Sequence, residues 1–244
     1  MHPADWQITM KNFTLVSFSN SPKCICNSLG RSVLLVSLTL LGACSNSLVV
    51  DGQFPQPLVK KLPLTLGVHY DQAFSQYTYV EKSEDRSKWT IENGKAQTEL
   101  FDIVLPGMFE RVVPLDQLPG VALADSDGSV APGIDLVLSP LVDEFQYAMP
   151  RETKINVFEI WIKYNMRVYN ADGQLIADWI MSSYGKTPTA FMKSKEEALN
   201  QAVVMAVRDI GARMSLTFQR VPEIRAWLEQ HNKTMINNTR APQT

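Results

Sequence analysis

The clearest pattern in the chain is an alternation of apolar and polar residues over 155–169. The apolar positions of this run are Phe158, Ile160, Ile162, Tyr164, Met166 and Val168. A period of two predicts a strand with one face in the core and the other in water. The turn residues Asn170-Ala171-Asp172-Gly173 and a second such run, 174–184, complete a predicted antiparallel hairpin.

Shorter runs rich in aromatic and β-branched residues predict further strands. They cover residues 63–70, 76–81, 87–92, 110–115 and 134–147. The last opens on Leu136-Val137-Leu138, and a contiguous apolar run is typical of a central strand that is buried on both faces.

Two longer segments have helical spacing. The first, 95–109, contains Pro106, which should kink or end the helix. The second follows Ser194, with Glu197 three residues later, the pattern of a capping box. Its apolar stripe contains several alanines, which predicts close packing on a sheet. A short helix over 223–229 should follow Pro222.

This order of elements predicts an α+β fold. We expect a single domain over 63–229, with a mostly antiparallel sheet and two main helices packed on one face. Residues 44–62 include two prolines and lack periodicity, which predicts a tether. The polar residues 230–244 predict a disordered tail.

The first 43 residues have the anatomy of a secretory signal peptide. Lys23 and Arg31 precede an apolar run over 32–41, and Gly42-Ala43 follows it. The run is shorter than the roughly 18 apolar residues that span a bilayer. A buried core segment is the alternative interpretation, and either Met1 or Met10 could be the first residue of the leader.

The motif Leu41-Gly42-Ala43-Cys44 resembles the lipobox of bacterial lipoproteins. The resemblance implies cleavage after Ala43, a diacylglycerol on the sulfur of Cys44 and an acyl group on its new amino terminus. Ser45, where aspartate would retain the protein, implies the periplasmic face of the outer membrane. Removal of the leader takes Cys24 and Cys26 with it, which leaves no disulfide in the mature chain.

Behind this motif, residues 63–220 resemble the YajG-type and curli-secretion-type envelope lipoproteins. The resemblance rests on the order of elements and on the strand opening Ile134-Asp135-Leu136-Val137-Leu138. It implies a domain without enzymatic activity that works through protein contacts.

The sequence contains no recognisable catalytic set. His69 is the one histidine in the predicted domain, and no Gly-x-Ser-x-Gly motif accompanies it. The segment 125–128 (Asp-Ser-Asp-Gly) lacks the other ligands of a calcium loop. Asp143 and Glu144 should point to opposite faces of their strand. We therefore predict no metal and no cofactor besides the lipid.

The polar face of the strand over 155–169 carries the candidate partner-binding residues. These are Trp161, Lys163 and Arg167, and Tyr147 and Trp179 lie on neighbouring strands. An exposed aromatic ring with nearby cations could bind a protein, a glycan or a lipid phosphate. The alternative is that Trp161 packs beneath a helix or loop. Exposed edge strands offer a second route, by addition of a partner strand.

These features favour a non-enzymatic, outer-membrane-anchored lipoprotein that acts as an assembly, scaffolding or accessory factor. Its expected partners are the membrane and an envelope protein or a second copy of the chain. A lipid- or glycan-binding lipoprotein is the first alternative and an envelope hydrolase the second. The net charge of −2 and the lack of a basic run indicate no nucleic-acid partner.

Overall fold

The computed structural model describes residues 46–82, 88–119, 133–150, 156–189 and 194–240, all within one compact unit, Ser45–Thr244. The elements, in chain order, are β1 (Asn46–Val49), β2 (Leu62–Val68), α2 (Gln72–Ser75), β3 (Thr78–Val80), β4 (Trp89–Glu92), α3 (Gly94–Met108), β5 (Phe109–Pro114), β6 (Leu136–Ala148), β7 (Val157–Asn170), β8 (Leu175–Pro188), α5 (Lys195–Thr217), the 3-10 helix η2 (Phe218–Arg220) and α6 (Pro222–Arg240).

The strands form two sheets. A five-stranded sheet has the order β5-β2-β6-β7-β8, and a three-stranded sheet has the order β1-β4-β3. The predicted α+β class and the antiparallel hairpin β7–β8 are confirmed, and β6 is central as expected. The sheets are nevertheless mixed, because β2 runs parallel to both β5 and β6 and β1 runs parallel to β4.

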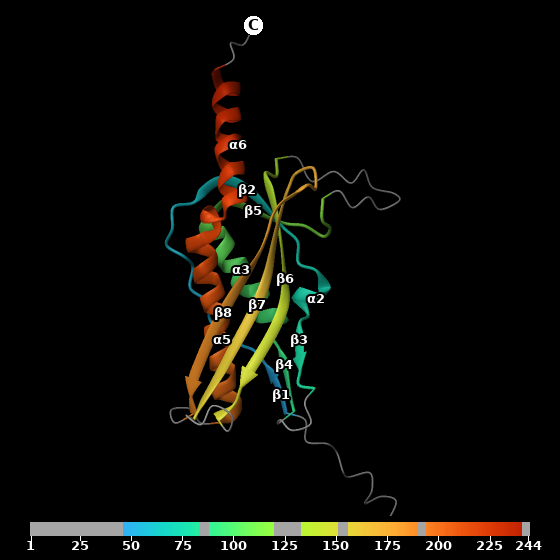
Figure 1. The fold of residues 1–244 in the computed structure, drawn as a ribbon, viewed down its shortest axis with the longest axis vertical. Helices are drawn as coiled ribbons and strands as arrows, with labels where there is room; N and C mark the ends of the chain where they lie inside the picture. The colour runs from blue at the N-terminus through green and yellow to red at the C-terminus, as the bar shows by residue number, and fades with distance from the viewer. Residues whose placement is uncertain (1–45, 83–87, 120–132, 151–155, 190–193, 241–244) are drawn as a thin grey trace, which may run out of the picture. The chain divides into compact units, whose positions relative to one another are not determined.

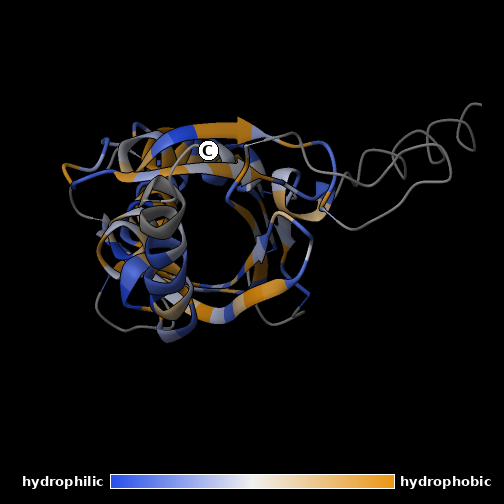
Figure 2. Ribbon diagram, turned by 90° about the horizontal axis from the view of Figure 1, so that it is seen from above, coloured by the Kyte–Doolittle hydropathy of each residue, from blue (hydrophilic) through white to orange (hydrophobic). Residues whose placement is uncertain are grey.

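One face of the five-stranded sheet forms the core. Helices α3 and α5 cover it together, as predicted, while α2 and β3 lie beside β6 (Figure 1). The apolar positions of β7 point into this core and are fully buried. Seen from above, hydrophobic and hydrophilic residues are interspersed along the ribbon (Figure 2). We call the opposite face of this sheet the outer face.

Close contact between α5 and the sheet depends on small residues. Ala198, Ala202 and Ala206 lie fully buried on the stripe of α5 that faces the sheet. On β8 the matching residue is Gly185, where a Cβ atom would lie 2.1 Å from the backbone oxygen of Ala202. The close packing predicted from the alanine-rich stripe is therefore confirmed.

A β-bulge in β6 changes which residues face the core. The pairing with β7 shifts between Val142 and Glu144, so Asp143 is the extra residue. Leu136 and Leu138 face the core before the bulge, whereas Phe145 and Tyr147 face it afterwards. The prediction that Asp143 and Glu144 lie on opposite faces is wrong, because the extra residue reverses the alternation. Glu144 forms an ion pair with Lys163 on the outer face. The negative charge of Asp143 also helps to raise the pKa of Lys163.

The segment predicted to be a tether over 44–62 is part of the fold from Asn46 onward. Leu48, Val50 and Phe54 are buried. Hydrogen bonds to α5 fix the intervening backbone: Asn200 Nδ2 donates to the oxygen of Asp51 at 2.8 Å, and its Oδ1 accepts from the Asp51 amide at 3.0 Å. This buried apolar surface and these bonds stabilise a structure that the tether prediction did not anticipate.

The C-terminal helix is longer than the predicted helix over 223–229. It continues to Arg240, so the predicted disordered tail over 230–244 is helical across most of its length. Ile224 is fully buried, and the ring of Trp227 stacks on that of His231, with the ring centroids 4.7 Å apart. His231 also lies 3.8 Å from Asp135, which accepts the Thr65 amide of β2 at 2.8 Å. These contacts dock the first half of α6, and the helix then extends beyond the sheet (Figure 1).

The predicted start of α5 is confirmed. The side chain of Ser194 accepts a hydrogen bond from the amide of Glu197 at 3.0 Å, and thereby satisfies one of the free amides of the first turn.

Replacing this cap should lower stability moderately. Ser194→Ala removes the acceptor, and we expect the free energy of unfolding to fall by about 1 kcal/mol, measured by urea denaturation followed by circular dichroism. Ser215→Ala is the matched control, because Ser215 lies inside α5 and alanine is the better helix former there. An equal loss in the two variants would contradict a capping role for Ser194.

Candidate partner-binding surface

The outer face carries the three residues singled out in the sequence. Because residues two apart on a strand share a face, Trp161, Lys163 and Arg167 all project from β7 away from the helices. Trp161 is 39% exposed and packs on Tyr184 of β8, with the ring centroids 5.4 Å apart. The alternative that Trp161 is buried beneath a helix or loop is therefore not observed.

Lys163 is already engaged on this face. Its ammonium group forms an ion pair with Glu144, which also accepts a hydrogen bond from Gln146. The hydrogen bonds from Lys163 and Gln146 hold the pKa of Glu144 below its usual value, and the bond to Glu144 raises the pKa of Lys163. The pair therefore stays charged at neutral pH, and Lys163 is not a free cation for an anionic ligand.

Arg167 lies apart from the other two candidates. It is six residues from Trp161 along β7, which corresponds to roughly 20 Å of strand. Its Nε lies 3.6 Å from a carboxylate oxygen of Asp178 on β8. A shallow groove of about 210 Å³ includes Trp161 and Lys163 but not Arg167. The three residues thus share a face without forming one site.

The other two aromatic candidates do not belong to the outer face. Tyr147 is 2% exposed and makes an edge contact with Tyr79 in the core. Trp179 points to the helical side and packs against Phe218, with the ring centroids 6.3 Å apart. The bulge in β6 accounts for Tyr147, because it brings the odd-numbered residues after it to the core face.

Sequence reasoning missed the contribution of β8 to this surface. Tyr184 is 37% exposed, and its hydroxyl donates to a carboxylate oxygen of Glu159. Burial, together with this bond, raises the pKa of Tyr184 to about 12, so the group remains a neutral donor. Ile180 is 50% exposed on the same strand. The alternation within 175–188 was the available signal for both residues.

The remaining chemical candidates give no reactive site in the described part of the chain. Nδ1 of His69 lies 3.2 Å from the backbone oxygen of Leu115, an ordinary structural contact. Among the described residues, no three His, Cys, Asp or Glu side chains are close enough to hold a metal ion. The calcium-like segment 125–128 and Cys44 lie outside the described residues.

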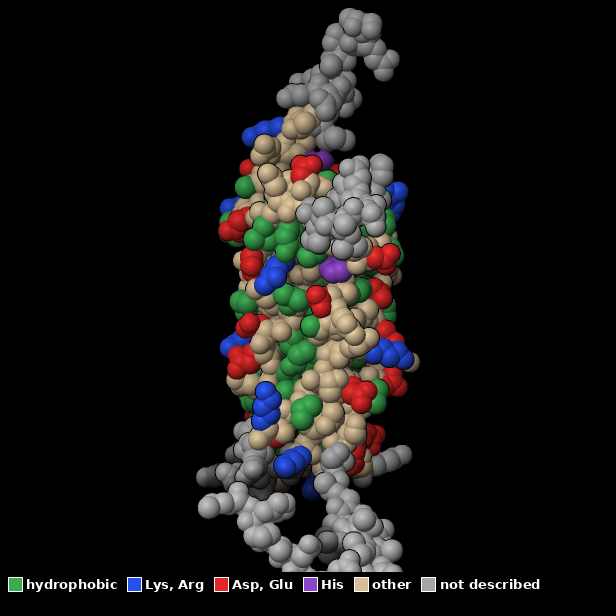
Figure 3. Space-filling model, turned by 90° about the vertical axis from the view of Figure 1, so that its right-hand side faces the viewer, with side chains coloured by type: hydrophobic (Ala, Val, Ile, Leu, Met, Phe, Trp, Pro, Cys, Tyr) green, Lys and Arg blue, Asp and Glu red, His purple; other side chains and the backbone are tan. Residues whose placement is uncertain are grey.

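Charge does not mark out a binding face either. On the side of the molecule shown in Figure 3, acidic and basic side chains are interspersed rather than gathered by sign. Within the described ranges, no helix combines the length and the apolar character required to cross a bilayer.

Comparisons with known proteins give similarity to solved structures alone. No family model matches the chain, and no curated protein matches it. A DUF330 protein from Xanthomonas campestris is 11% identical, with a TM-score of 0.44 over 72% of this chain and 96% of its own. A minor lipoprotein from Acinetobacter baumannii is 10% identical, with a TM-score of 0.37 over 67% and 97% of the two chains.

A third similar structure is a hypothetical protein from Chlamydia trachomatis. It is 13% identical, with a TM-score of 0.34 over 63% of this chain and 96% of its own. Such values do not assign the chain to a family. The resemblance to YajG-type and curli-secretion-type lipoproteins therefore stays a prediction.

Proposed function

We propose that the protein is a non-enzymatic envelope lipoprotein, anchored through Cys44 at the periplasmic face of the outer membrane. In this role it holds its domain against the membrane and acts through contacts with an envelope protein. The observation that carries the proposal is the spacing between the lipobox-like motif and the fold. Cys44 precedes Asn46, the first residue of β1, by only two positions.

This spacing leaves little freedom for a lipid-anchored domain. Two residues span at most about 7 Å, so the beginning of β1 would lie close to the lipid headgroups. The start of α5 lies at the same end of the domain, whereas α6 leaves from the opposite end (Figure 1). The domain would therefore stand on the membrane with α6 and the β7–β8 turn pointing away from it.

The groove beside Trp161 does not favour the ligand-binding alternative. The groove beside Trp161, at about 210 Å³, is smaller than the roughly 300–1,000 Å³ of most small-molecule sites. The charged residues around it already form ion pairs with one another. An exposed sheet face of this kind suits a protein partner better than an enclosed lipid or glycan.

Removal of the proposed anchor should release the protein. We expect Cys44→Ser to move the chain from the membrane fraction to the soluble fraction and to abolish labelling by supplied palmitate. Each buried CH2 group of an acyl chain contributes about 0.8 kcal/mol, so the loss of all chains removes the membrane affinity. Cys26→Ser, in the leader, is the matched control and should change neither result. Equal palmitate labelling of Cys44→Ser would refute the anchor.

The proposed orientation of the domain on the membrane can be measured with the same membrane-bound protein. Once the leader is removed, Cys44 is the remaining cysteine and its sulfur carries the lipid, so an introduced cysteine can be labelled selectively. A fluorophore at Lys88→Cys, beside β1, should be quenched strongly by headgroup-linked quenchers. One at Asp172→Cys, in the distant β7–β8 turn, should not. Equal quenching at the two positions would exclude a domain that stands on the membrane.

A further inference from the structure

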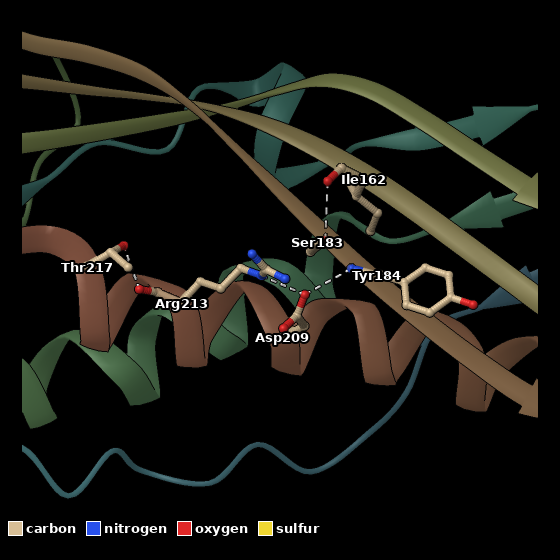
Figure 4. Close-up of polar contacts among 6 residues, drawn as sticks. All are labelled: Ile162, Ser183, Tyr184, Asp209, Arg213 and Thr217. Atoms are coloured by element: carbon tan, nitrogen blue, oxygen red, sulfur yellow. Dashed lines mark hydrogen bonds and ion pairs between the residues drawn. The ribbon is translucent and has the colours of Figure 1, made fainter.

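Strand β8 leaves one edge of the five-stranded sheet open. It is the last strand of the order β5-β2-β6-β7-β8, so among the described residues its outward amides and carbonyls have no neighbouring strand. The amide of Tyr184 shows which residues point outward, because it donates to Oδ2 of Asp209 on α5 at 3.0 Å (Figure 4). Since backbone groups alternate along a strand, the amides of Ile180 and Ser182 also point to the open edge.

Asp209 protects only part of this edge. Its carboxylate bridges the Tyr184 amide and Nε of Arg213, at 3.0 and 2.9 Å (Figure 4). On the side of Pro188, the backbone of α5 lies directly against Gly185. On the other side, no described side chain accepts from Ile180 or Ser182. Unprotected edges of this kind are the places where sheets accept an additional strand.

A groove of about 300 Å³ follows this open part of the edge. Residues 179–182 of β8 line one side, and Arg213, Thr217 and Arg220 line the other. Among the described residues that line the groove, these two arginines are the charged ones. Arg213 is paired with Asp209, whereas Arg220 has no ion-pair partner in the described part of the chain. The groove therefore combines backbone donors and acceptors with a guanidinium group that no described carboxylate neutralises.

We infer that this edge binds an extended segment of a partner protein that carries an acidic side chain. The segment pairs as a sixth strand with the backbone of Ile180 and Ser182, and its carboxylate binds Arg220. The inference deepens the proposed function and rests on its protein-contact part, since it specifies how such a partner is held. The edge lies in the half of β8 nearest the β7–β8 turn, the end that points away from the membrane in that proposal.

A second copy of this chain is a poorer occupant than an acidic segment. A two-fold axis at the groove would bring each Arg220 toward the Arg220 of the other copy, and like charges repel. Each copy would also carry its own α5 and η2 into the space beside the groove. A single extended segment avoids both difficulties and supplies the charge that the groove lacks.

The test uses the full-length chain in a neutral detergent and three fluorescent peptides. The first is acetyl-Glu-Val-Thr-Val-Thr-Glu-amide, the second has lysine for both glutamates, and the third is the acidic peptide with alternate backbone nitrogens methylated. We expect the acidic peptide to bind and the other two to bind at least about tenfold more weakly, because charged hydrogen bonds and strand pairing are lost. Fluorescence anisotropy measures the affinity.

Variants locate the binding on the molecule. Arg220→Glu should weaken binding of the acidic peptide by about tenfold or more and strengthen binding of the lysine peptide. Arg225→Glu reverses an exposed charge on α6 outside the groove and should leave the affinity unchanged. In addition, the amides of Ile180 and Ser182 should exchange hydrogen more slowly when the acidic peptide is bound.

Several results would overturn the inference. The inference is wrong if the acidic peptide does not bind, or if the methylated peptide binds equally well. It is also wrong if Arg220→Glu and Arg225→Glu lose the same amount of affinity for the acidic peptide. A dimer in sedimentation that is disrupted by Ile180→Lys would identify a second copy as the occupant and overturn it as well. The peptide measurements do not depend on the lipid. They therefore remain valid if the Cys44 anchor is refuted, and the failure of one proposal can be distinguished from the failure of the other.

Discussion

Gly185→Ala is expected to lower the free energy of unfolding by about 3 kcal/mol or more, at the upper end of overpacking effects. The added Cβ would lie 2.1 Å from the oxygen of Ala202 and 2.4 Å from the nitrogen of Ala206. Both are backbone atoms of α5, so no rotamer change relieves the clash. The helix must instead move away from β8, which disturbs its buried contacts with the core. Denaturation by urea, followed by far-ultraviolet circular dichroism, measures the loss.

Gly52→Ala is the matched comparison for this variant. There the added Cβ would meet the side chain of Val204, with the nearest carbon at 2.6 Å. Val204 is itself buried, but a side chain can shift more easily than the helix backbone, so we expect a smaller loss, about 1 kcal/mol. If Gly185→Ala costs no more than Gly52→Ala, the close contact between α5 and β8 is not the constraint that the distances indicate.

The elements that the sequence predicted well are those defined by local periodicity. The run over 155–169 became β7 with its apolar positions in the core, and the alternation within it needs no distant information. Likewise, the cap at Ser194 depends on a residue only three positions away. Such signals are short-range, so the sequence alone suffices to detect them.

Pairing partners and irregularities within strands could not be obtained in the same way. Parallel pairing of β2 with β5 and β6 brings together residues that are about 45 to 70 positions apart, and no periodic pattern encodes this choice. The bulge at Asp143 adds one residue to β6 and reverses the orientation of every later side chain. An alternation pattern counted through the bulge therefore placed Asp143 and Glu144 on opposite faces.

The segment 46–62 shows a related limit. Its buried residues Leu48, Val50 and Phe54 are too few and too irregularly spaced to form a periodic signal. The two prolines and the polar residues between them are typical of a tether. What orders the segment is a set of contacts with α5, for example the bond from Arg208 Nη2 to the oxygen of Gln53 at 2.6 Å. Those contacts join residues about 150 positions apart.

The candidate surface was predictable in position but not in detail. Alternation placed Trp161, Lys163 and Arg167 on one face, as the structure has them. The ion pairs that already engage Lys163 and Arg167 come from β6 and β8, so they required the register of three strands. Asp209, which protects part of the β8 edge, approaches from a helix 25 residues later in the chain. The open edge therefore became visible only with the tertiary structure.

A buried polar network should make Gln97→Leu the second most damaging substitution, with a loss of about 3 kcal/mol. Gln97 is fully buried on α3. Its Nε2 donates to the oxygen of Phe74 at 2.6 Å, and its Oε1 accepts from Asn93 at 3.0 Å and from the hydroxyl of Tyr164 at 3.3 Å. Leucine fills a similar volume but leaves all three partners without this side chain. Urea denaturation of the variant measures the loss.

Tyr164→Phe separates loss of the network from loss of one bond. Burial raises the pKa of Tyr164 above its usual range, so its hydroxyl is neutral and donates to Gln97. Removing this hydroxyl leaves the other two bonds of Gln97 intact, so we expect a loss of only about 1 kcal/mol. The double variant should lose less stability than the sum of the losses in the two single variants. Without the Tyr164 hydroxyl, Gln97→Leu leaves one fewer buried group without a partner. Strict additivity, or a loss in Gln97→Leu no larger than in Tyr164→Phe, would show that Gln97 does not organise these groups.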